Sequence, residues 1–205
     1  MRTKAPLSAL AIACALAVGA LAAAGALAAA GILAAADAFA ADAGIHFRRG
    51  LEAQEAGNLS LALEEYQAAL DLKGDDPAVF HNRALVYVSG GDWAKALADA
   101  ERAVSLAPRD GAYLVTLGVV LMGVDRPDLK RARTLFIEAA DILARAGDTA
   151  GFGNACYNLG VMARKGRNFR EARRYFELAL KADPDDQRAL DALAAMGVYP
   201  SPPQE

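Results

Sequence analysis

The amino-acid sequence predicts an all-α fold in which four similar helix–turn–helix units stack as a solenoid. The first observation behind this prediction is a set of small residues that recur along the chain, namely Gly50, Ala84, Gly118 and Gly160. The second is a set of alanines that follows them at a nearly constant spacing, namely Ala62, Ala96, Ala132 and Ala172. Small residues facing each other let two helices approach closely, so the pattern indicates repeated helical pairs.

Each unit has defined boundaries, a turn between its two helices and residues that end its helices. The four segments are 43–76, 77–110, 111–152 and 153–186. Aromatic residues recur near the middle of the second helices and are expected to fill the space toward the next unit, namely Tyr66, Phe136 and Phe176. Glycine-containing turns separate the two helices, namely 57–58, 90–92 and 166, and Pro108 and Pro184 are expected to end second helices. No unit buries its apolar face alone, so the units must stack.

The third unit departs from the regular length. Arg126-Pro127 lengthens its internal turn, and the stretch LARAGDTAGFG, residues 143–153, lengthens its exit. We therefore expect the regular spacing to be interrupted between the third and fourth units.

This pattern resembles the tetratricopeptide repeat. The fourth unit carries the resemblance most clearly, with Leu159-Gly160, Phe169, Glu171-Ala172, Phe176, Ala179-Leu180 and Pro184. The resemblance covers residues 43–186 and implies a right-handed α-solenoid of four such repeats. The stretch 187–197 is expected to form a helix that caps the exposed edge of the stack, and residues 198–205 a disordered tail.

Residues 1–40 have the pattern of an export signal. Residues 1–4 are basic, residues 7–36 contain no charge, and residues 38–40 read Ala-Phe-Ala, the spacing of small residues that precedes signal cleavage. We therefore expect cleavage after Ala40 and a periplasmic domain.

The same stretch also supports an uncleaved membrane anchor. Its uncharged run exceeds the ~20 residues that a helix needs to span a bilayer. Alanine and glycine are only weakly apolar, however, so the drive for insertion is modest. A third interpretation is a lipoprotein, since residues 11–14 resemble a lipobox, but the apolar run continues beyond Cys14. In every version the basic N-terminus stays in the cytoplasm and the domain lies outside it.

Composition argues against several classes of function. The chain has 22 basic and 25 acidic residues, whereas a nucleic-acid-binding domain is usually basic overall. Two histidines, His46 and His81, are too few for a His-rich metal site, and Cys156 is expected to be a buried packing residue. Residues 147–154 lack the Lys-Ser/Thr pair of a phosphate loop. We expect no cofactor, no metal and no catalytic set.

The tetratricopeptide resemblance implies a concave groove lined by the first helix of each unit. The expected groove residues are Phe47, Leu51, Gln54, His81, Leu85, Val88, Val115, Val119, Met122, Tyr157, Val161, Arg164 and Lys165. Members of the family that clamp a terminal carboxylate have asparagine where Leu85, Val119 and Val161 stand, so no such clamp is expected. The groove is mostly apolar with a basic end. The alternative is that these residues only pack between units or lie under the chain's own ends.

The basic stretch RKGRNFREARR, residues 164–174, divides between these roles. Phe169 and Ala172 are expected to point into the helix pair. Arg170, Arg173 and Arg174 are expected on the outer face, with Arg173 paired to Glu177 and Arg167 to Glu171. Only Arg164 and Lys165 face the expected groove.

The sequence thus predicts an exported protein–protein interaction module, an adaptor or scaffold that binds a partner peptide or helix. The alternatives are an accessory subunit of an envelope enzyme or secretion complex, or an enzyme with an unrecognised site.

Overall fold

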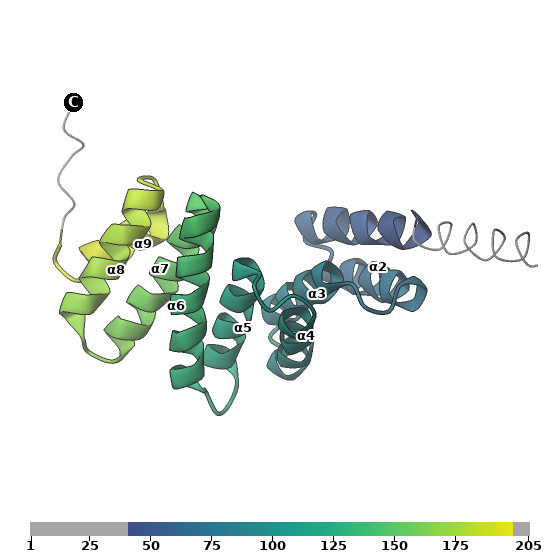
Figure 1. Ribbon diagram of the computed structural model, residues 1–205, viewed down its shortest axis with the longest axis horizontal. Helices are drawn as coiled ribbons and strands as arrows, with labels where there is room; N and C mark the ends of the chain where they lie inside the picture. Colours follow the sequence, from purple (N-terminus) through teal and green to yellow (C-terminus); the bar gives the residue numbers. More distant parts are fainter. Residues whose placement is uncertain (1–40, 199–205) are drawn as a thin grey trace, which may run out of the picture.

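The computed structural model describes residues 41–198, which form a stack of antiparallel helices (Figure 1). Residues 41–55 are helical. They are followed by α2 (Leu59–Leu72), α3 (Pro77–Ser89), α4 (Trp93–Leu106), α5 (Gly111–Gly123), α6 (Leu129–Ala146), α7 (Thr149–Lys165), α8 (Phe169–Ala182) and α9 (Gln187–Ala194). The first helices of the units are helix 41–55, α3, α5 and α7, and the second helices are α2, α4, α6 and α8. The fold is an α-solenoid, and no strand occurs within residues 41–198.

Every helix from α2 to α9 begins with the same local device. The residue before the helix is Asn or Asp, and its side chain accepts a hydrogen bond from a backbone N–H of the first turn. These N-caps are Asn58, Asp76, Asp92, Asp110, Asp128, Asp148, Asn168 and Asp186. The cap satisfies N–H groups that the helix itself leaves unpaired, so it fixes where each helix starts.

The recurrent aromatic rings pack over the glycine of their own unit. A Cβ added to Gly160 would lie 2.6 Å from a ring carbon of Phe176, and Gly118 has the same relation to Phe136. The same rings also belong to clusters that reach the next helix pair, as the sequence predicts: Phe136 clusters with Leu159 of α7, and Phe176 with Leu193 of α9. In the second unit both positions are alanine, and the pair Ala84 and Ala100 is fully buried.

In three of the four units the turn between the paired helices has left-handed backbone at one position. Gly57 and Gly91 have φ values of 75° and 77°, directly before the N-caps of α2 and α4. In the fourth unit the equivalent residue is Arg167, with φ 60°, whereas Gly166 has an ordinary φ of −77°. The glycine expected to make this turn thus lies one residue away from the strained position.

The extra length of the third unit is mostly helical. α6 has 18 residues and α7 has 17, whereas α4 has 14 and α5 has 13. Gly147, with φ 74°, ends α6, and α7 starts two residues later. The stretch 143–153 therefore adds about one turn to each of two facing helices, and residues 152 and 153 both lie inside α7.

A buried ion pair joins the two helices of the second unit, and its arginine also hydrogen-bonds to the first unit. The Arg83 guanidinium donates to both carboxylate oxygens of Asp99, at 2.7 and 2.8 Å, and to Gln67 of α2 at 2.6 Å. The Asp99 side chain is only 9% exposed. Nothing in the spacing of the sequence points to this pair.

Two of the predictions for the basic stretch are wrong. Phe169 is 56% exposed and does not point into the helix pair. Glu171 accepts from Arg133 of α6 and from Asn168, not from Arg167, because the left-handed turn places Arg167 before the helix begins. The predicted pair of Arg173 with Glu177 is confirmed at 2.7 Å.

The C-terminal edge is covered by α9, which buries Ala189, Ala192 and Leu193 against the stack. The helix ends at Ala194, and residues 195–197 form a turn. The predicted signal or anchor at 1–40 and all of the predicted tail except Val198 lie outside the described residues. Within them, no helix is long and apolar enough to cross a membrane.

Candidate partner-binding groove

One hollow, apolar over much of its lining, runs across four alternate helices of the stack, α3, α5, α7 and α9. It has a volume of about 330 Å³ and opens to solvent. α3 contributes His81, Leu85 and Val88; α5 contributes Ala112, Val115, Thr116 and Val119; α7 contributes Gly151, Asn154 and Asn158; and α9 contributes Arg188. α3 contacts α5, and α5 contacts α7, so the lining is continuous.

The apolar part of the hollow comes from α3 and α5. Leu85, Val88, Val115 and Val119 place aliphatic side chains along it, and all but Leu85 also touch the core cluster around Phe136 and Leu117. These side chains therefore serve both as packing between units and as the wall of the hollow. For these residues, a role in a binding groove and a role in packing between units are therefore compatible.

The polar end of the hollow is a charge-compensated arginine. Arg188 donates to both oxygens of Asp186, each at 2.9 Å, and to Asn154 Oδ1 at 2.7 Å. Its guanidinium carbon also lies 4.8 Å from the centre of the Tyr157 ring. The hydrogen bond from Arg188 lowers the pKa of Asp186, so the pair stays ionised at neutral pH. Because the charges of Arg188 and Asp186 cancel, this end of the hollow carries no net charge, but it can still form hydrogen bonds with polar groups of a partner.

Two asparagines on first helices point their amides back along their own helices. Asn82 donates to the Ala78 carbonyl at 2.8 Å, and Asn158 donates to the Asn154 carbonyl at 2.9 Å. For Asn158, which lines the hollow, the side-chain oxygen is left to accept from a bound segment.

His81 lies at the α3 side of the hollow and is mostly buried. Its ring centre is 4.8 Å from that of Tyr113, and its Nδ1 atom is buried without a hydrogen-bond partner among the described residues. Burial lowers the pKa of His81, and the nearby Asp110 only partly opposes this effect. The neutral imidazole is therefore the stable form at neutral pH.

The hollow brings together some of the expected groove residues and leaves others outside. Five of them line it, namely His81, Leu85, Val88, Val115 and Val119. Eight do not, namely Phe47, Leu51, Gln54, Met122, Tyr157, Val161, Arg164 and Lys165.

Several of these eight have packing roles instead. Phe47 and Leu51 pack against the core of the first unit, and Gln54 accepts a hydrogen bond from the Tyr66 hydroxyl at 2.8 Å. Burial, the larger cause, and the nearby Glu55 raise the pKa of Tyr66 to about 12, so the hydroxyl remains a donor. The guanidinium carbon of Arg164 lies 5.9 Å from the centre of the Phe176 ring.

Sequence reasoning missed the polar end of the hollow. Arg188 belongs to a helix whose only expected role is to cap the stack, and Asn154 lies in the irregular stretch before the fourth unit. The one signal in the sequence for this polar end is the position of Arg188, two residues after the N-cap Asp186. A long side chain so close to the start of a helix can extend beyond the end of that helix.

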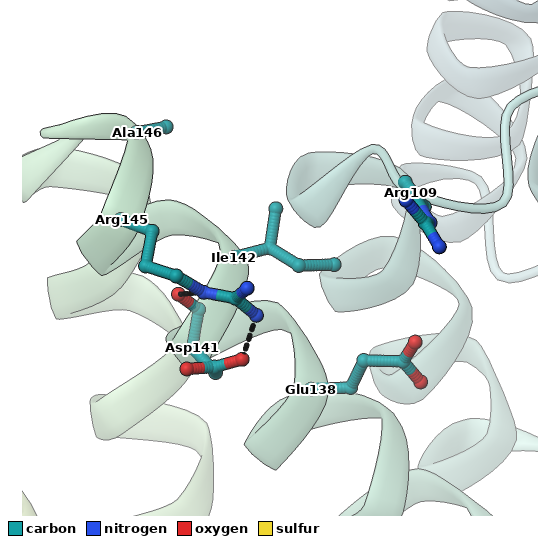
Figure 2. A pocket seen from close by; sticks show the side chains of 6 residues that line it. All are labelled: Arg109, Glu138, Asp141, Ile142, Arg145 and Ala146. Carbon is teal, nitrogen blue, oxygen red and sulfur yellow. Dashed lines mark hydrogen bonds and ion pairs between the residues drawn. The ribbon is translucent and has the colours of Figure 1, made fainter.

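A second hollow, of about 600 Å³, lies against the outer side of α6 (Figure 2). Arg109, from the loop before α5, faces Glu138, Asp141, Ile142, Arg145 and Ala146 of α6. Arg145 pairs with Asp141 on the same helix. Both side chains are exposed and their charges cancel, so this hollow is a surface feature without the buried polar groups of a binding site.

Chemistry of other kinds has little support among the described residues. No group of three or more His, Cys, Asp or Glu residues between 41 and 198 is placed to hold a metal ion. Cys156 is buried, and burial raises the pKa of its thiol to about 11, as expected of a packing residue rather than a nucleophile.

Comparison with known proteins places this fold in a family. The family model named Tetratricopeptide repeat matches residues 153–186. The fourth unit thus matches this repeat, and the stack as a whole shares the fold of solved tetratricopeptide repeat proteins. The matched segment is the fourth unit, in which the resemblance is clearest in the sequence. Proteins of this fold generally serve as interaction modules, so the fold supports a protein–protein interaction scaffold.

Curated relatives include two proteins named Photosystem I assembly protein Ycf3. The Cyanophora paradoxa protein is 33% identical over 108 residues, which are 48% of this chain and 62% of the relative. The protein of Prochlorococcus marinus strain NATL1A is 33% identical over 82 residues, 38% of this chain and 47% of the relative. The chain thus spans only about half to three fifths of the length of these relatives.

Solved structures share the fold at lower sequence identity. A pilF structure from Pseudomonas aeruginosa has a TM-score of 0.66 at 17% identity, covering 78% of this chain and 71% of that one. TTC0263, a thermophilic TPR protein of Thermus thermophilus, has 0.65 at 17%, covering 76% and 83%. A MamA protein has 0.58 at 16%, covering 77% and 84%. These likenesses concern the fold alone.

Proposed function

We propose that the chain is a scaffold that binds an apolar segment of a partner protein in the hollow formed by α3, α5, α7 and α9. The observation that carries this proposal is the aliphatic wall built by α3 and α5, which stays open to solvent in a hollow that α7 and α9 complete. A partner side chain placed there gains roughly 25 cal/mol for each Å² of apolar surface removed from water, before the cost of ordering the segment. A volume of about 330 Å³ accommodates a few aliphatic side chains rather than a whole helix.

The polar groups suggest how the segment continues beyond the hollow. Asn154, Asn158, Val161 and Lys165 are spaced so that they share one face of α7. A partner that leaves the hollow along this face passes Val161 and reaches the basic end of the helix, Arg164 and Lys165. We propose that an acidic residue of the partner lies there.

The central test is a paired charge substitution. Leu85→Glu with Val119→Glu puts two carboxylates in the hollow and should abolish capture of the partner, while circular dichroism shows unchanged helicity. The matched control is Leu61→Glu with Ile137→Glu, since both residues are aliphatic and exposed, at 41% and 47%, and lie outside the hollow. If the hollow variant still crosslinks to the same proteins in the native compartment, the hollow is not the binding site.

A second test addresses the acidic end of the partner. Charge reversal at Arg164 and Lys165 should weaken binding more than reversal at Arg170 and Arg174, which start the outer helix α8. The opposite ranking would place the contact on the outer side of the solenoid.

We further propose that the chain is exported and acts during the assembly of a larger protein complex. Export is supported by the sequence of residues 1–40, and an assembly role by the name of the curated relatives. Mass measurement of the purified protein tests the first part, because a mature chain should begin at Ala41. An intact Met1 in purified membranes would favour the anchored alternative.

A further inference from the structure

The turns inside the last two units are strongly basic, whereas those inside the first two are not. With its flanking residues, each turn runs from the last two residues of the first helix to the sixth residue of the second. In the first two units these stretches, 54–64 and 88–98, hold one basic and three acidic residues. In the last two, 122–134 and 164–174, they hold ten basic and three acidic residues. The whole chain has a net charge of −3, so this positive charge is local.

The two basic turns lie at the same edge of the solenoid. The turn between α5 and α6 and the turn between α7 and α8 are both on the lower side of the stack in Figure 1. The starts of α6 and α8 are also joined directly, because Arg133 donates to Glu171 at 2.5 Å. Side chains at the starts of these two helices therefore belong to one continuous surface.

Large apolar side chains are exposed among these charges. Leu129 opens α6 and is 47% exposed, and Phe169 opens α8 and is 56% exposed. In the second unit the equivalent residue is Trp93, which packs on the next unit, since a Cβ added to Gly123 at the end of α5 would lie 2.2 Å from its ring. The first helix that follows Phe169 is α9, which has 8 residues where α5 has 13. The last two units thus expose apolar side chains at a position that the second unit covers.

A basic residue directly follows each exposed apolar residue. Lys130 follows Leu129 and Arg170 follows Phe169, whereas the first two units have serine and alanine at this position. We refer to the surface of the two turns as the basic edge, which consists of Arg126, Leu129, Lys130, Arg167, Phe169 and Arg170. Its four basic residues are exposed, and none of them forms an ion pair within residues 41–198.

The acidic residues beside the basic edge are mostly engaged elsewhere. Asp128 caps α6 by accepting from the Arg131 N–H at 2.9 Å, and Glu171 is paired with Arg133. Asp125 is the one acidic residue of the two turns whose side chain makes no hydrogen bond or ion pair within residues 41–198. The four cations of the basic edge are therefore opposed by a single uncommitted carboxylate.

We propose that the basic edge binds the surface of a membrane that contains anionic phospholipids. Each lysine or arginine near such a surface strengthens binding roughly fivefold, through attraction to the negative headgroups. Leu129 and Phe169 then lie at the boundary between headgroups and acyl chains, the place that apolar residues of interfacial helices occupy. The solenoid lies on the membrane by this edge and leaves the hollow, which other residues line, for a protein partner.

The exposed apolar residues favour a membrane over other polyanions. The ring of Phe169 can stack on a nucleic-acid base, but the aliphatic side chain of Leu129 has no such interaction to make. An acidic peptide matches the charges and leaves both apolar side chains in water. A membrane surface satisfies the cations and the apolar side chains together.

Tryptophan fluorescence tests the proposal at the basic edge itself. Phe169→Trp in a Trp93→Phe background gives the full chain a single tryptophan, because Trp93 is the only one in the sequence. Its emission reports on this position whether or not residues 1–40 are retained. We expect a shift to shorter wavelength with phosphatidylcholine vesicles that contain about 30% phosphatidylglycerol, and none with phosphatidylcholine alone. The shift should decrease as salt is raised.

Neutralising the basic edge should weaken this binding. Lys130→Gln with Arg170→Gln should raise the lipid concentration at half-maximal shift about 25-fold, because two cations are lost. The matched control is Arg49→Gln with Lys181→Gln, which removes one arginine and one lysine that are exposed and lie outside the two basic turns. The control should change this concentration less than about twofold. Leu129→Ala, which leaves every charge in place, should raise it about threefold.

The proposal is overturned if both kinds of vesicle give the same shift, or if the neutralised edge binds as well as its control. A larger shift with single-stranded DNA than with vesicles would assign the basic edge to nucleic acid instead. A dimer that Phe169→Ala dissociates would assign it to a second copy of the chain. The variant with Lys130→Gln and Arg170→Gln should still capture the partner, and Leu85→Glu with Val119→Glu should still bind vesicles. Failure of this proposal is therefore distinguishable from failure of the proposed function.

Discussion

The pairing of a glycine with an aromatic ring inside three of the four units leads to a prediction in which the effect of one mutation on stability changes sign. Gly160→Ala places a methyl group 2.6 Å from the Phe176 ring, so the helices must separate or the ring must move. Overpacking of this kind costs about 1–3 kcal/mol. Alanine recovers about 1 kcal/mol through its higher helix propensity. We therefore expect Gly160→Ala to destabilise the wild-type protein by about 1 kcal/mol.

The same substitution should stabilise a protein that lacks the ring. Phe176→Ala alone should cost about 3–5 kcal/mol, because the ring is fully buried and leaves a cavity. In that background the methyl group of Gly160→Ala meets no ring, partly fills the cavity and keeps its propensity gain. We expect it to add about 1 kcal/mol of stability. The double variant reproduces the natural arrangement of the second unit, Ala84 with Ala100, at the same spacing.

Urea unfolding followed by circular dichroism at 222 nm measures all four proteins of this cycle. Repeat proteins can lose two-state behaviour when one unit is weakened, so the dependence on urea must be the same in each variant before free energies are compared. Destabilisation by Gly160→Ala of similar size in both backgrounds would refute the reasoning, since the cost would then come from the backbone and not from the ring.

Three further outcomes follow from the described contacts. Arg167→Gly should raise the free energy of unfolding by about 1 kcal/mol, because glycine adopts the φ of 60° without strain; an unchanged urea midpoint would contradict this. Arg83→Met should cost about 3–5 kcal/mol by leaving the Asp99 carboxylate buried and unpaired, and Asp99→Leu in the same chain should recover part of it. The lowered pKa of His81 means that the unfolded chain takes up this proton first, so stability should fall as the pH drops below about 6.5, and His81→Phe should flatten this part of a pH series.

The stacking of helical pairs could be predicted from sequence because small residues recur where paired helices cross. Gly118 and Ala132, for example, lie where the two helices of one unit cross. Such crossings need small residues at regular spacing, so the spacing alone predicts the fold. Leu85 and Val119 could likewise be placed in a groove, since they occupy one position on successive first helices.

Other features depend on contacts that repeat spacing does not encode. Phe169 has the same register as Trp93, and nothing in the repeat spacing distinguishes the two residues. Its exposure follows from the early end of α9, a helix in another part of the sequence. Arg188 is a similar case, because it reaches the hollow only through the way α9 sits beside α7.

The irregular third unit is connected to the hollow, which gives its extra residues a physical role. Leu143, in the added turn of α6, is buried so closely over Gly111 that a Cβ there would lie 2.4 Å from its Cγ. On its other side the same leucine crowds Gly151, in the added turn of α7, where a Cβ would lie 2.8 Å from Leu143 and 2.6 Å from the N-cap Asp148. Gly151 lines the hollow, so the added turns extend its wall beyond what regular repeats would build. Gly151 is therefore explained by packing beside the hollow, whereas Gly147 is explained by its left-handed φ of 74° at the end of α6.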